Sequence, residues 1–415
     1  MTTTPTRTPP TARQGPPPDP ARLRAAVEEY AHAFRATALA MDEPGADPRT
    51  LNPVVHDAYF PVLLGLPPAY NPDPLIVDGR PCHLHSCVER VVVYERLAWG
   101  DAALMVAAPG PSLSGVLTEE LGDDDQKERY YTTLAARPTW TFFALTEPHA
   151  GSDATALTTA LTESGTESST EPGTEPGTGS GASGSYRLSG VKKYIGNAVR
   201  ADLGVVFARI RPGPVGVVAV LVEPTRPGFT ATALPTTGMR AIGLSEVRLD
   251  DVPVSRSDIL GMHLSATRRG IVGAMRTFNR ARPVVAAMAL GIAQAAWDYA
   301  AVHRRALRAD ESHAREVLRR RLAGTRRLVL AAAEQADRDP GDGTVASAAK
   351  YRAAELALET AEYALGLLGP GARLEHPLLD KLHRDARAFE FMEGTGTMQR
   401  LNLALGHRKG RILDD

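Results

Sequence analysis

The sequence predicts a mainly α-helical fold with a central β domain: an N-terminal helical domain, a middle barrel or sheet, and a C-terminal helical bundle. Two observations support this. Apolar residues recur at helical spacing from Leu23 to about Arg137 and again after Ala266. Between Trp140 and Asp250, short β-branched or aromatic runs are bounded by Pro and Gly, which is typical of strands. With 415 residues, 43% of them hydrophobic, the chain can bury a large core and should form two or three domains.

The changes in pattern set the predicted domain boundaries. Residues 1–22 are rich in Thr, Pro and Arg, contain seven prolines, and predict a disordered tail. They have no hydrophobic stretch, which argues against a secretory signal, while their few acidic residues leave an organelle transit peptide as the alternative. We expect N-terminal helices at 23–137, the β domain at 138–257 and the C-terminal bundle at 258–415.

One segment of the predicted β domain does not resemble a strand. Residues 162–184 begin with a four-residue repeat of Thr-Glu followed by Ser, Pro or Gly, and continue into a Gly/Ser-rich run. Its glycine spacing superficially resembles a dinucleotide-binding loop, but no helix follows. This low-complexity composition predicts a flexible insertion at a hairpin tip, where added length costs little stability.

Charge and cysteine content exclude several classes of function. A net charge of −1 provides no basic surplus for nucleic acid or an anionic membrane. No apolar run reaches the ~18 residues that a spanning helix requires without charges or breakers. Cys82, His83, His85 and Cys87 could form a zinc site, but the usual longer loop between ligand pairs is missing. We therefore expect reduced thiols, no metal and a cytoplasmic location.

Two polar segments stand out as candidates for chemistry. Near the end of the chain, Glu393 is followed at once by Gly394-Thr395-Gly396, and glycine lets backbone approach a ligand closely. Much earlier, the polar turn 145–153 interrupts apolar sequence. Together these segments resemble the signature of the acyl-CoA dehydrogenase family, whose members oxidise thioesters with FAD. The resemblance extends from about residue 50 to 412.

The resemblance implies a role for each matching position. Glu393 aligns with the catalytic base, and its backbone N–H with a donor to the thioester carbonyl. The positions expected to contact FAD are Phe143, Leu145, Thr146, Ser152, Tyr194, Ile195, Gly196, Thr395 and Thr397. Those expected to line the substrate channel are Ser152, Asn279, Arg282, Met392 and Gly394.

The reaction itself favours a buried glutamate. Removing hydrogens from adjacent carbons of a thioester requires a base for the α-proton and a cofactor for the β-hydride. Burial would raise the pKa of Glu393 and strengthen it as a base, and apolar Phe391 and Met392 are consistent with burial. The alternative is a surface glutamate at a helix start, and Glu390 is a rival carboxylate. Some family members place the base at the position of Ala281, which cannot accept a proton.

Several positions depart from the family pattern. Tyr194 and Gly196 replace the usual tryptophan and threonine, and acyl-CoA oxidases, which use O₂, commonly have glycine at the second position. The stretches 304–311 and 365–371 lack most of the polar groups that grip the FAD adenosine across a subunit interface, which puts the usual tetramer in doubt. Arg282 suits an ion-pair role as well as substrate binding.

These observations predict an FAD-dependent dehydrogenase acting on an acyl thioester of CoA or of a carrier protein. We expect electron-transfer flavoprotein as the acceptor and a homodimer or homotetramer as the assembly. The alternatives are an oxidase, or a catalytically impaired partner of an active homologue.

Overall fold

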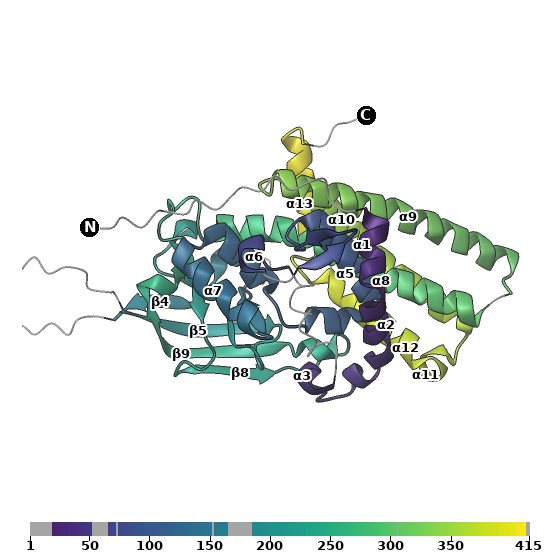
Figure 1. Ribbon diagram of the computed structural model, residues 1–415, viewed down its shortest axis with the longest axis horizontal. Helices are drawn as coiled ribbons and strands as arrows, with labels where there is room; N and C mark the ends of the chain where they lie inside the picture. The colour runs from purple at the N-terminus through teal and green to yellow at the C-terminus, as the bar shows by residue number, and fades with distance from the viewer. Residues whose placement is uncertain are drawn as a thin grey trace, which may run out of the picture.

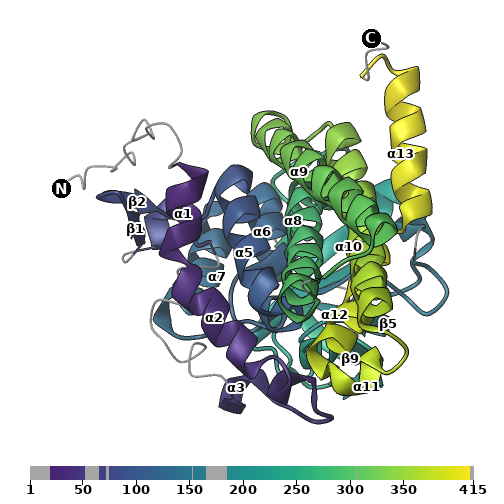
Figure 2. The same ribbon diagram turned by 90° about the vertical axis from the view of Figure 1, so that its right-hand side faces the viewer.

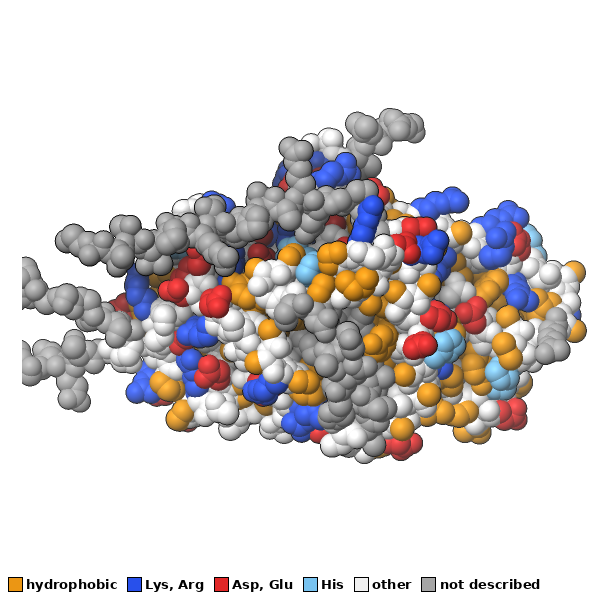
Figure 3. All heavy atoms as spheres, viewed as in Figure 1, with side chains coloured by type: hydrophobic (Ala, Val, Ile, Leu, Met, Phe, Trp, Pro, Cys, Tyr) orange, Lys and Arg blue, Asp and Glu red, His pale blue; other side chains and the backbone are white. Residues whose placement is uncertain are grey.

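The predicted fold class is confirmed: helices surround a central sheet domain. The computed structural model describes residues 19–51, 65–71, 74–151, 153–164, 185–304 and 306–411. The strands gather at one end of the molecule and the long helices at the other (Figure 1). On the face shown in Figure 3, basic and acidic side chains are interspersed, in line with the small net charge.

The N-terminal part is helical, as expected. Its elements are α1 (Pro20–Ala26), α2 (Glu28–Thr37), η1 (Ala40–Asp42), α3 (Pro48–Leu51), η3 (Pro68–Tyr70), β1 (Leu75–Val77), β2 (Arg80–Cys82), α5 (Cys87–Val106), α6 (Ser112–Leu121) and α7 (Asp124–Ala136). Helix α5 begins at a capping box, in which the Ser86 hydroxyl accepts a hydrogen bond from the Glu89 N–H at 3.1 Å. Helix α1 begins at Pro20, inside the stretch predicted as a tail, and residues 1–18 lie outside the described residues.

The middle part forms one mixed sheet. Its strands are β3 (Thr141–Ala144), β4 (Ala160–Glu163), β5 (Ser185–Ile195), β6 (Leu203–Arg209), β7 (Val217–Val222), β8 (Phe229–Ala233), β9 (Ser245–Ser255) and β10 (Ile259–Leu260). They are ordered β10-β7-β6-β4-β5-β9-β8, and β3 pairs in parallel with β6. Along β6, Val206 and Val205 belong to different apolar clusters, so both faces of the strand are buried.

Two predicted boundaries of the β domain need correction. Residues Thr162 and Glu163, expected at the start of the insertion, continue strand β4 and pair with β5. The sheet also extends past residue 257, because β10 pairs with β7. Residues 165–184, the rest of the predicted insertion, lie outside the described residues.

The C-terminal part is a bundle around one long helix. Its elements are α8 (Ile271–His303), α9 (Ala309–Arg338), α10 (Thr344–Leu368), α11 (Ala372–Glu375), α12 (Pro377–Ala386), η8 (Arg387–Glu390) and α13 (Gly396–Arg408). Helix α8 is long and apolar enough to cross a membrane, but 67% of its apolar window is buried inside the protein. Its composition is therefore that of a core helix, packed against α5 and α10. Helix α13 extends away from the bundle (Figure 2).

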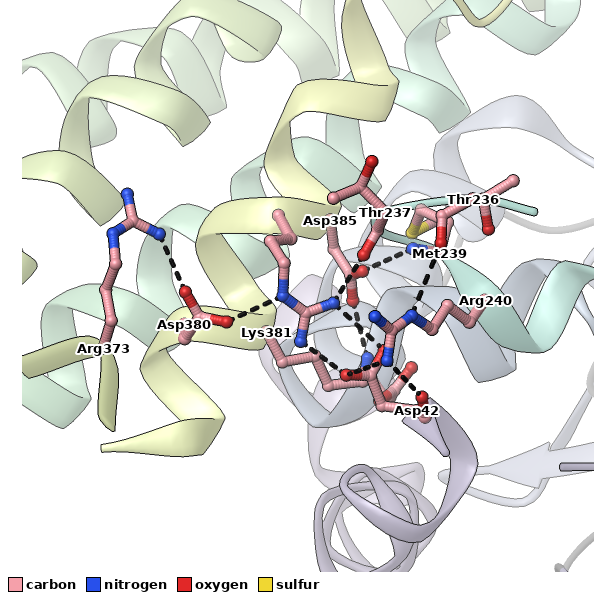
Figure 4. A network of polar contacts seen from close by, with 11 residues as sticks. Asp42, Thr236, Thr237, Met239, Arg240, Arg373, Asp380, Lys381 and Asp385 are labelled. Carbon is pink, nitrogen blue, oxygen red and sulfur yellow. Dashed lines mark hydrogen bonds and ion pairs between the residues drawn. The ribbon is translucent and has the colours of Figure 1, made fainter. Parts of the chain in front are cut away.

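A buried ionic network joins the three parts (Figure 4). Lys381 of α12, whose side chain is 2% exposed, lies 2.7 Å from Asp101 of α5 and 2.6 Å from Asp385. The Asp385 carboxylate also accepts the backbone N–H of Met239, which precedes η6 (Arg240–Ile242). Helix α12 leads directly toward Glu393, so this network fixes the approach of the C-terminal segment to the β domain.

Candidate active site

Glu393 lies in a turn between η8 and α13 whose backbone is strained. Its φ is +49°, in the left-handed region that side chains other than glycine rarely adopt, and Gly394 follows at φ +100°. Buried side chains hold the turn. Gln399 Nε2 donates to the carbonyls of Glu393 (3.0 Å) and Gly394 (2.9 Å). Lys350 Nζ donates to the carbonyls of Glu390 (2.9 Å) and Gly394 (2.7 Å). Such strain persists only where the surroundings impose it.

One oxygen of the Glu393 carboxylate has no hydrogen-bond partner in the part of the chain that the structure describes. This atom, Oε2, is buried. Burial raises the pKa of Glu393 to about 7, against the opposing charges of Lys350 and Arg282. A carboxyl group that titrates near neutral pH, with a free oxygen, is suited to accepting a proton.

The neighbouring acid and the neighbouring aromatic residue behave differently from Glu393. Glu390 accepts a hydrogen bond from the Gly396 N–H at 2.7 Å, so it stabilises the start of α13 and is already engaged. The expectation that Phe391 helps to bury the acid is wrong, because its side chain is 72% exposed. Met392 is half-buried and packs against the helical core.

Asn279 and Arg282, the predicted substrate-binding residues of α8, are engaged by the protein itself. Arg282 is 4% exposed and donates to the Glu393 carbonyl (3.3 Å) and to Asn279 Oδ1 (2.7 Å). Asn279 in turn donates to the carbonyl of Pro340 (2.9 Å). In this structure both residues tie the Glu393 turn to α8 and to the loop before α10.

The turn after β3 is fixed by the end of β5. Lys192 Nζ donates to the Leu145 carbonyl at 3.1 Å, and the Lys193 N–H donates to the Thr146 carbonyl at 2.9 Å. Both carbonyls are therefore occupied, whereas the Thr146 hydroxyl has no partner among the described residues. The two segments predicted to contact FAD, around residues 145 and 194, thus lie side by side.

Beneath this turn lies a buried ion pair that the sequence analysis did not identify. Glu147 lies 2.8 Å from Lys192 and accepts hydrogen bonds from the N–H and hydroxyl groups of Thr158 and Thr159. Despite burial, which raises the pKa of Glu147, these donors lower it to about 2. The carboxylate is therefore a fixed anion that shapes the turn.

The Tyr194–Gly196 segment contains one exposed ring and one crowded glycine. Tyr194 has φ +62° and is 59% exposed, while Ile195 is buried in the sheet core. A Cβ added at Gly196 would lie 2.9 Å from Cγ2 of buried Ile242. The usual threonine therefore cannot occupy this position unless Ile242 moves, which gives a packing reason for the glycine.

Helix α8 brings the two halves of the site together. The Phe143 ring, at the end of β3, packs edge-on against Phe278 at 5.8 Å between centroids. Phe278 and Arg282 are four residues apart and share one helix face, and Arg282 contacts the Glu393 carbonyl. The β3 turn and the Glu393 turn thus border the same short stretch of α8.

Three of the residues predicted to contact FAD or substrate remain: Thr395, Thr397 and Ser152. Thr395 is the N-cap of α13 and accepts the Met398 N–H at 3.4 Å. Thr397 is exposed on the first turn of that helix. Ser152 lies outside the described residues.

Other parts of the described chain contain no comparable chemical site. Cys82 and Cys87 are free and buried, burial raises the pKa of each thiol to about 12, and no cluster that could hold a metal ion is present among the described residues. A hollow of ≈ 460 Å³ lies between α10, α11 and α12. It is bordered by part of the stretch 365–371 that departs from the family pattern, and no predicted site residue lines it.

Comparison with known proteins identifies the family. The models of the acyl-CoA dehydrogenase middle and C-terminal domains match residues 142–252 and 268–406. The 3-(aryl)acrylate reductase of Clostridium sporogenes (strain ATCC 15579) is 32% identical over 320 residues, 74% of this chain and 78% of the relative. An acyl-CoA dehydrogenase of Bacillus subtilis (strain 168) is 31% identical over 292 residues, 68% and 71% of the two chains.

A solved structure shares the fold at lower identity. The crystal structure of the prolyl acyl carrier protein oxidase AnaB has a TM-score of 0.77 and 21% identity, covering 93% of this chain and 98% of that one. Taken with the relatives above, these findings show that the chain belongs to the acyl-CoA dehydrogenase family. It is a flavoprotein oxidoreductase, and its cofactor is FAD.

The described residues fit this cofactor. The hydrogen bond from the Lys193 N–H to the Thr146 carbonyl brings two segments together. One segment contains the Thr146 hydroxyl, which has no partner among the described residues, and the other contains the exposed Tyr194 ring and Gly196. An aromatic face and a free hydroxyl suit a ring system that stacks and accepts or donates hydrogen bonds.

Proposed function

We propose that the protein dehydrogenates an acyl thioester between its α and β carbons, with Glu393 as the base that takes the α-proton. The observation that supports this most strongly is the Glu393 carboxylate. Its Oε2 is buried and unpartnered, and its pKa is raised to about 7 by burial. A base of this kind typically accelerates proton transfer by about 10²–10⁴-fold.

Residues of this chain prepare the acid for that step. FAD, when bound, supplies the acceptor for the hydride that leaves the β-carbon. Arg282, Lys350 and Gln399 fix the turn, so that the carboxylate of Glu393 is presented with one oxygen free. The Glu393 N–H has no partner among the described residues, and we assign it to the thioester carbonyl, where it would stabilise the developing enolate.

The decisive experiment is anaerobic titration of the purified flavoprotein with a panel of acyl thioesters, following flavin bleaching. Glu393→Gln keeps the shape of the side chain but cannot accept the proton, so bleaching should slow by at least about 10²-fold. Glu355→Gln, an exposed acid on α10, is the matched control and should bleach normally. Normal bleaching in Glu393→Gln would refute the assignment.

The thioester carrier is part of the proposal. Family membership suggests acyl-CoA, and the shared fold with a prolyl acyl carrier protein oxidase motivates a carrier-bound substrate as the alternative. Comparing flavin reduction by CoA and carrier-protein thioesters of one acyl chain separates the two. We further propose a cytoplasmic homodimer or homotetramer that passes electrons to an electron-transfer flavoprotein.

An oxidase is the second candidate, and Gly196 favours it. Acyl-CoA oxidases commonly have glycine at this position, and here the packing of Ile242 leaves little room for a larger residue. Peroxide release in air, without an added acceptor, would support the oxidase. Turnover that depends on electron-transfer flavoprotein and releases no peroxide would support the dehydrogenase.

A further inference from the structure

The lysine that helps to fix the Glu393 turn carries a buried charge, which the proposed chemistry does not explain. Lys350 is one of six lysines in the chain, lies on α10 and is 0% exposed. Its ammonium donates to the carbonyls of Glu390 and Gly394, which stand on either side of Glu393. No ion pair within 4.0 Å joins Lys350 to any described carboxylate.

Burying an ammonium in this way is costly unless something compensates for the lost hydration. Burial lowers the pKa of Lys350 to about 8, while Glu390 and Glu393 oppose that change, so the group remains mostly charged at neutral pH. The two carbonyls satisfy two of its three N–H donors. Compensation therefore comes from the turn itself and from the nearby acids.

We propose that Lys350 is a positioning residue: it clamps the backbone on both sides of Glu393, holds that residue in its left-handed conformation, and favours the ionised carboxylate without bonding to it. The catalytic part of this inference rests on the proposed function of Glu393. The clamp itself does not, because it follows from the hydrogen bonds to Glu390 and Gly394 alone.

This arrangement lets the charge of Lys350 favour the ionised carboxylate of Glu393 without occupying the oxygen that accepts the proton. A lysine bonded to the carboxylate would occupy the oxygen that must receive the proton. By bonding the carbonyls, Lys350 leaves Oε2 of Glu393 free while its charge still opposes the effect of burial. The charged groups that act on the acid are Arg282 from α8 and Lys350 from α10, and Glu390 from η8 acts in turn on Lys350.

The test compares Lys350→Met with the matched control Lys127→Met, which removes a lysine from α7. Methionine keeps the unbranched shape and removes the buried charge together with the cost of burying it. In the wild type Gln399 also donates to the Gly394 carbonyl, so this acceptor should keep one donor in the variant. Both proteins are prepared as flavin-loaded enzymes, and thermal unfolding is recorded first.

Two measurements then report on the two parts of the inference. In hydrogen–deuterium exchange, residues 390–399 should exchange at least about tenfold faster in Lys350→Met than in the wild type or in Lys127→Met. In the pH profile of thioester-driven flavin reduction, the acid limb should move to higher pH by about one unit or more, since an opposite charge nearby lowers a carboxyl pKa by that amount. Lys350→Arg keeps the charge and should restore the wild-type acid limb.

Each possible outcome either supports or overturns the positioning role of Lys350. Unchanged exchange together with an unchanged acid limb in Lys350→Met would overturn the proposal. If wild-type flavin is not reduced by any thioester, the proposed function fails, but the exchange measurement still judges the clamp. If Lys350→Met does not fold and Lys350→Arg folds with the wild-type profile, the need for a charge is supported. If neither folds, the residue is purely structural and the proposal is wrong.

Discussion

Glu147 and Glu393 each lie beside a buried lysine, and the two pairs have opposite properties. Glu147 bonds Lys192 directly and also accepts from Thr158 and Thr159, which lowers its pKa to about 2. The Glu393 carboxylate bonds no neighbour through Oε2, and burial raises its pKa to about 7. The difference lies in where the lysine binds: Lys192 contacts the carboxylate, whereas Lys350 contacts only the backbone beside it.

This comparison shows that a buried lysine does not by itself make a nearby acid inert. A carboxylate that accepts hydrogen bonds from several donors stays ionised, and its role is structural. A carboxylate whose lysine binds elsewhere stays free to exchange a proton. The first arrangement shapes the turn that contains residues predicted to contact FAD, and the second presents the candidate base.

The largest expected loss of stability comes from breaking the ion pair between Glu147 and Lys192. Glu147→Gln leaves the Lys192 ammonium buried without its counter-charge, which should cost about 3–5 kcal/mol of unfolding free energy. Glu393→Gln removes a charge near Lys350 and Arg282, but neither cation forms an ion pair with Glu393 and both keep their hydrogen bonds to backbone carbonyls. This variant should therefore unfold within about 1 kcal/mol of the wild type at neutral pH. Urea denaturation of both variants measures the difference. Equal losses in the two variants would contradict the comparison.

The next largest effect is on the pH dependence of the unfolding free energy, which should differ between the two glutamates. The folded-state pKa of Glu147 lies below its ordinary value of 4.5, so it contributes stability above about pH 4.5 that is lost as pH falls toward 2, on the order of 3 kcal/mol. The folded-state pKa of Glu393 is raised instead, so the stability that it contributes is complete below pH 4.5 and is lost as pH rises toward 7.

Unfolding free energies recorded from pH 3 to 8 test these signs. Glu393→Gln should flatten the curve between about pH 4.5 and 7 and leave the acid side unchanged. A variant that instead flattened the acid side would show that the two assignments are reversed.

A smaller effect should follow from removing one donor to Glu147. Thr159→Val deletes a buried hydroxyl that donates to the carboxylate at 2.6 Å, and a hydrogen bond to a charged group is worth about 1.5–3 kcal/mol. Thr158→Val removes a comparable bond at 2.7 Å from an exposed residue, where water replaces the donor, so its loss should be smaller. Thermal melts of the two variants rank them, and a larger loss for Thr158→Val would count against the role of burial.

The smallest expected effect concerns the turn at Glu393. Gly394→Ala places a Cβ at φ +100° and 3.0 Å from Gln399 Nε2, which should cost about 1 kcal/mol. Gly366→Ala, in the helix α10 with open space around it, should stabilise by about 0.5–1 kcal/mol. Melting temperatures of the two variants should therefore move in opposite directions. A stabilising Gly394→Ala would show that the turn is not strained.

Much of the fold could be predicted from the sequence because it depends on local sequence patterns. Helical periodicity at both ends and short β-branched runs between them predicted the α–β–α order, which the structure confirms. The Glu-Gly-Thr-Gly and Thr-Glu-Pro segments led to the correct family. The expectation that Phe391 helps to bury the acid was wrong, since apolar character does not reveal which way a side chain faces.

The sequence by itself determined the class of elements, their order and the candidate base, because these depend on residue type and near-neighbour spacing. Lys350 gave a weak signal, as a lysine on the apolar face of an Ala-rich helix, but nothing in the sequence says which atoms its ammonium meets. Only tertiary structure placed Lys192 on a carboxylate and Lys350 on carbonyls. These contacts join residues forty or more positions apart, and burial together with hydrogen bonding then sets the acidity of each glutamate.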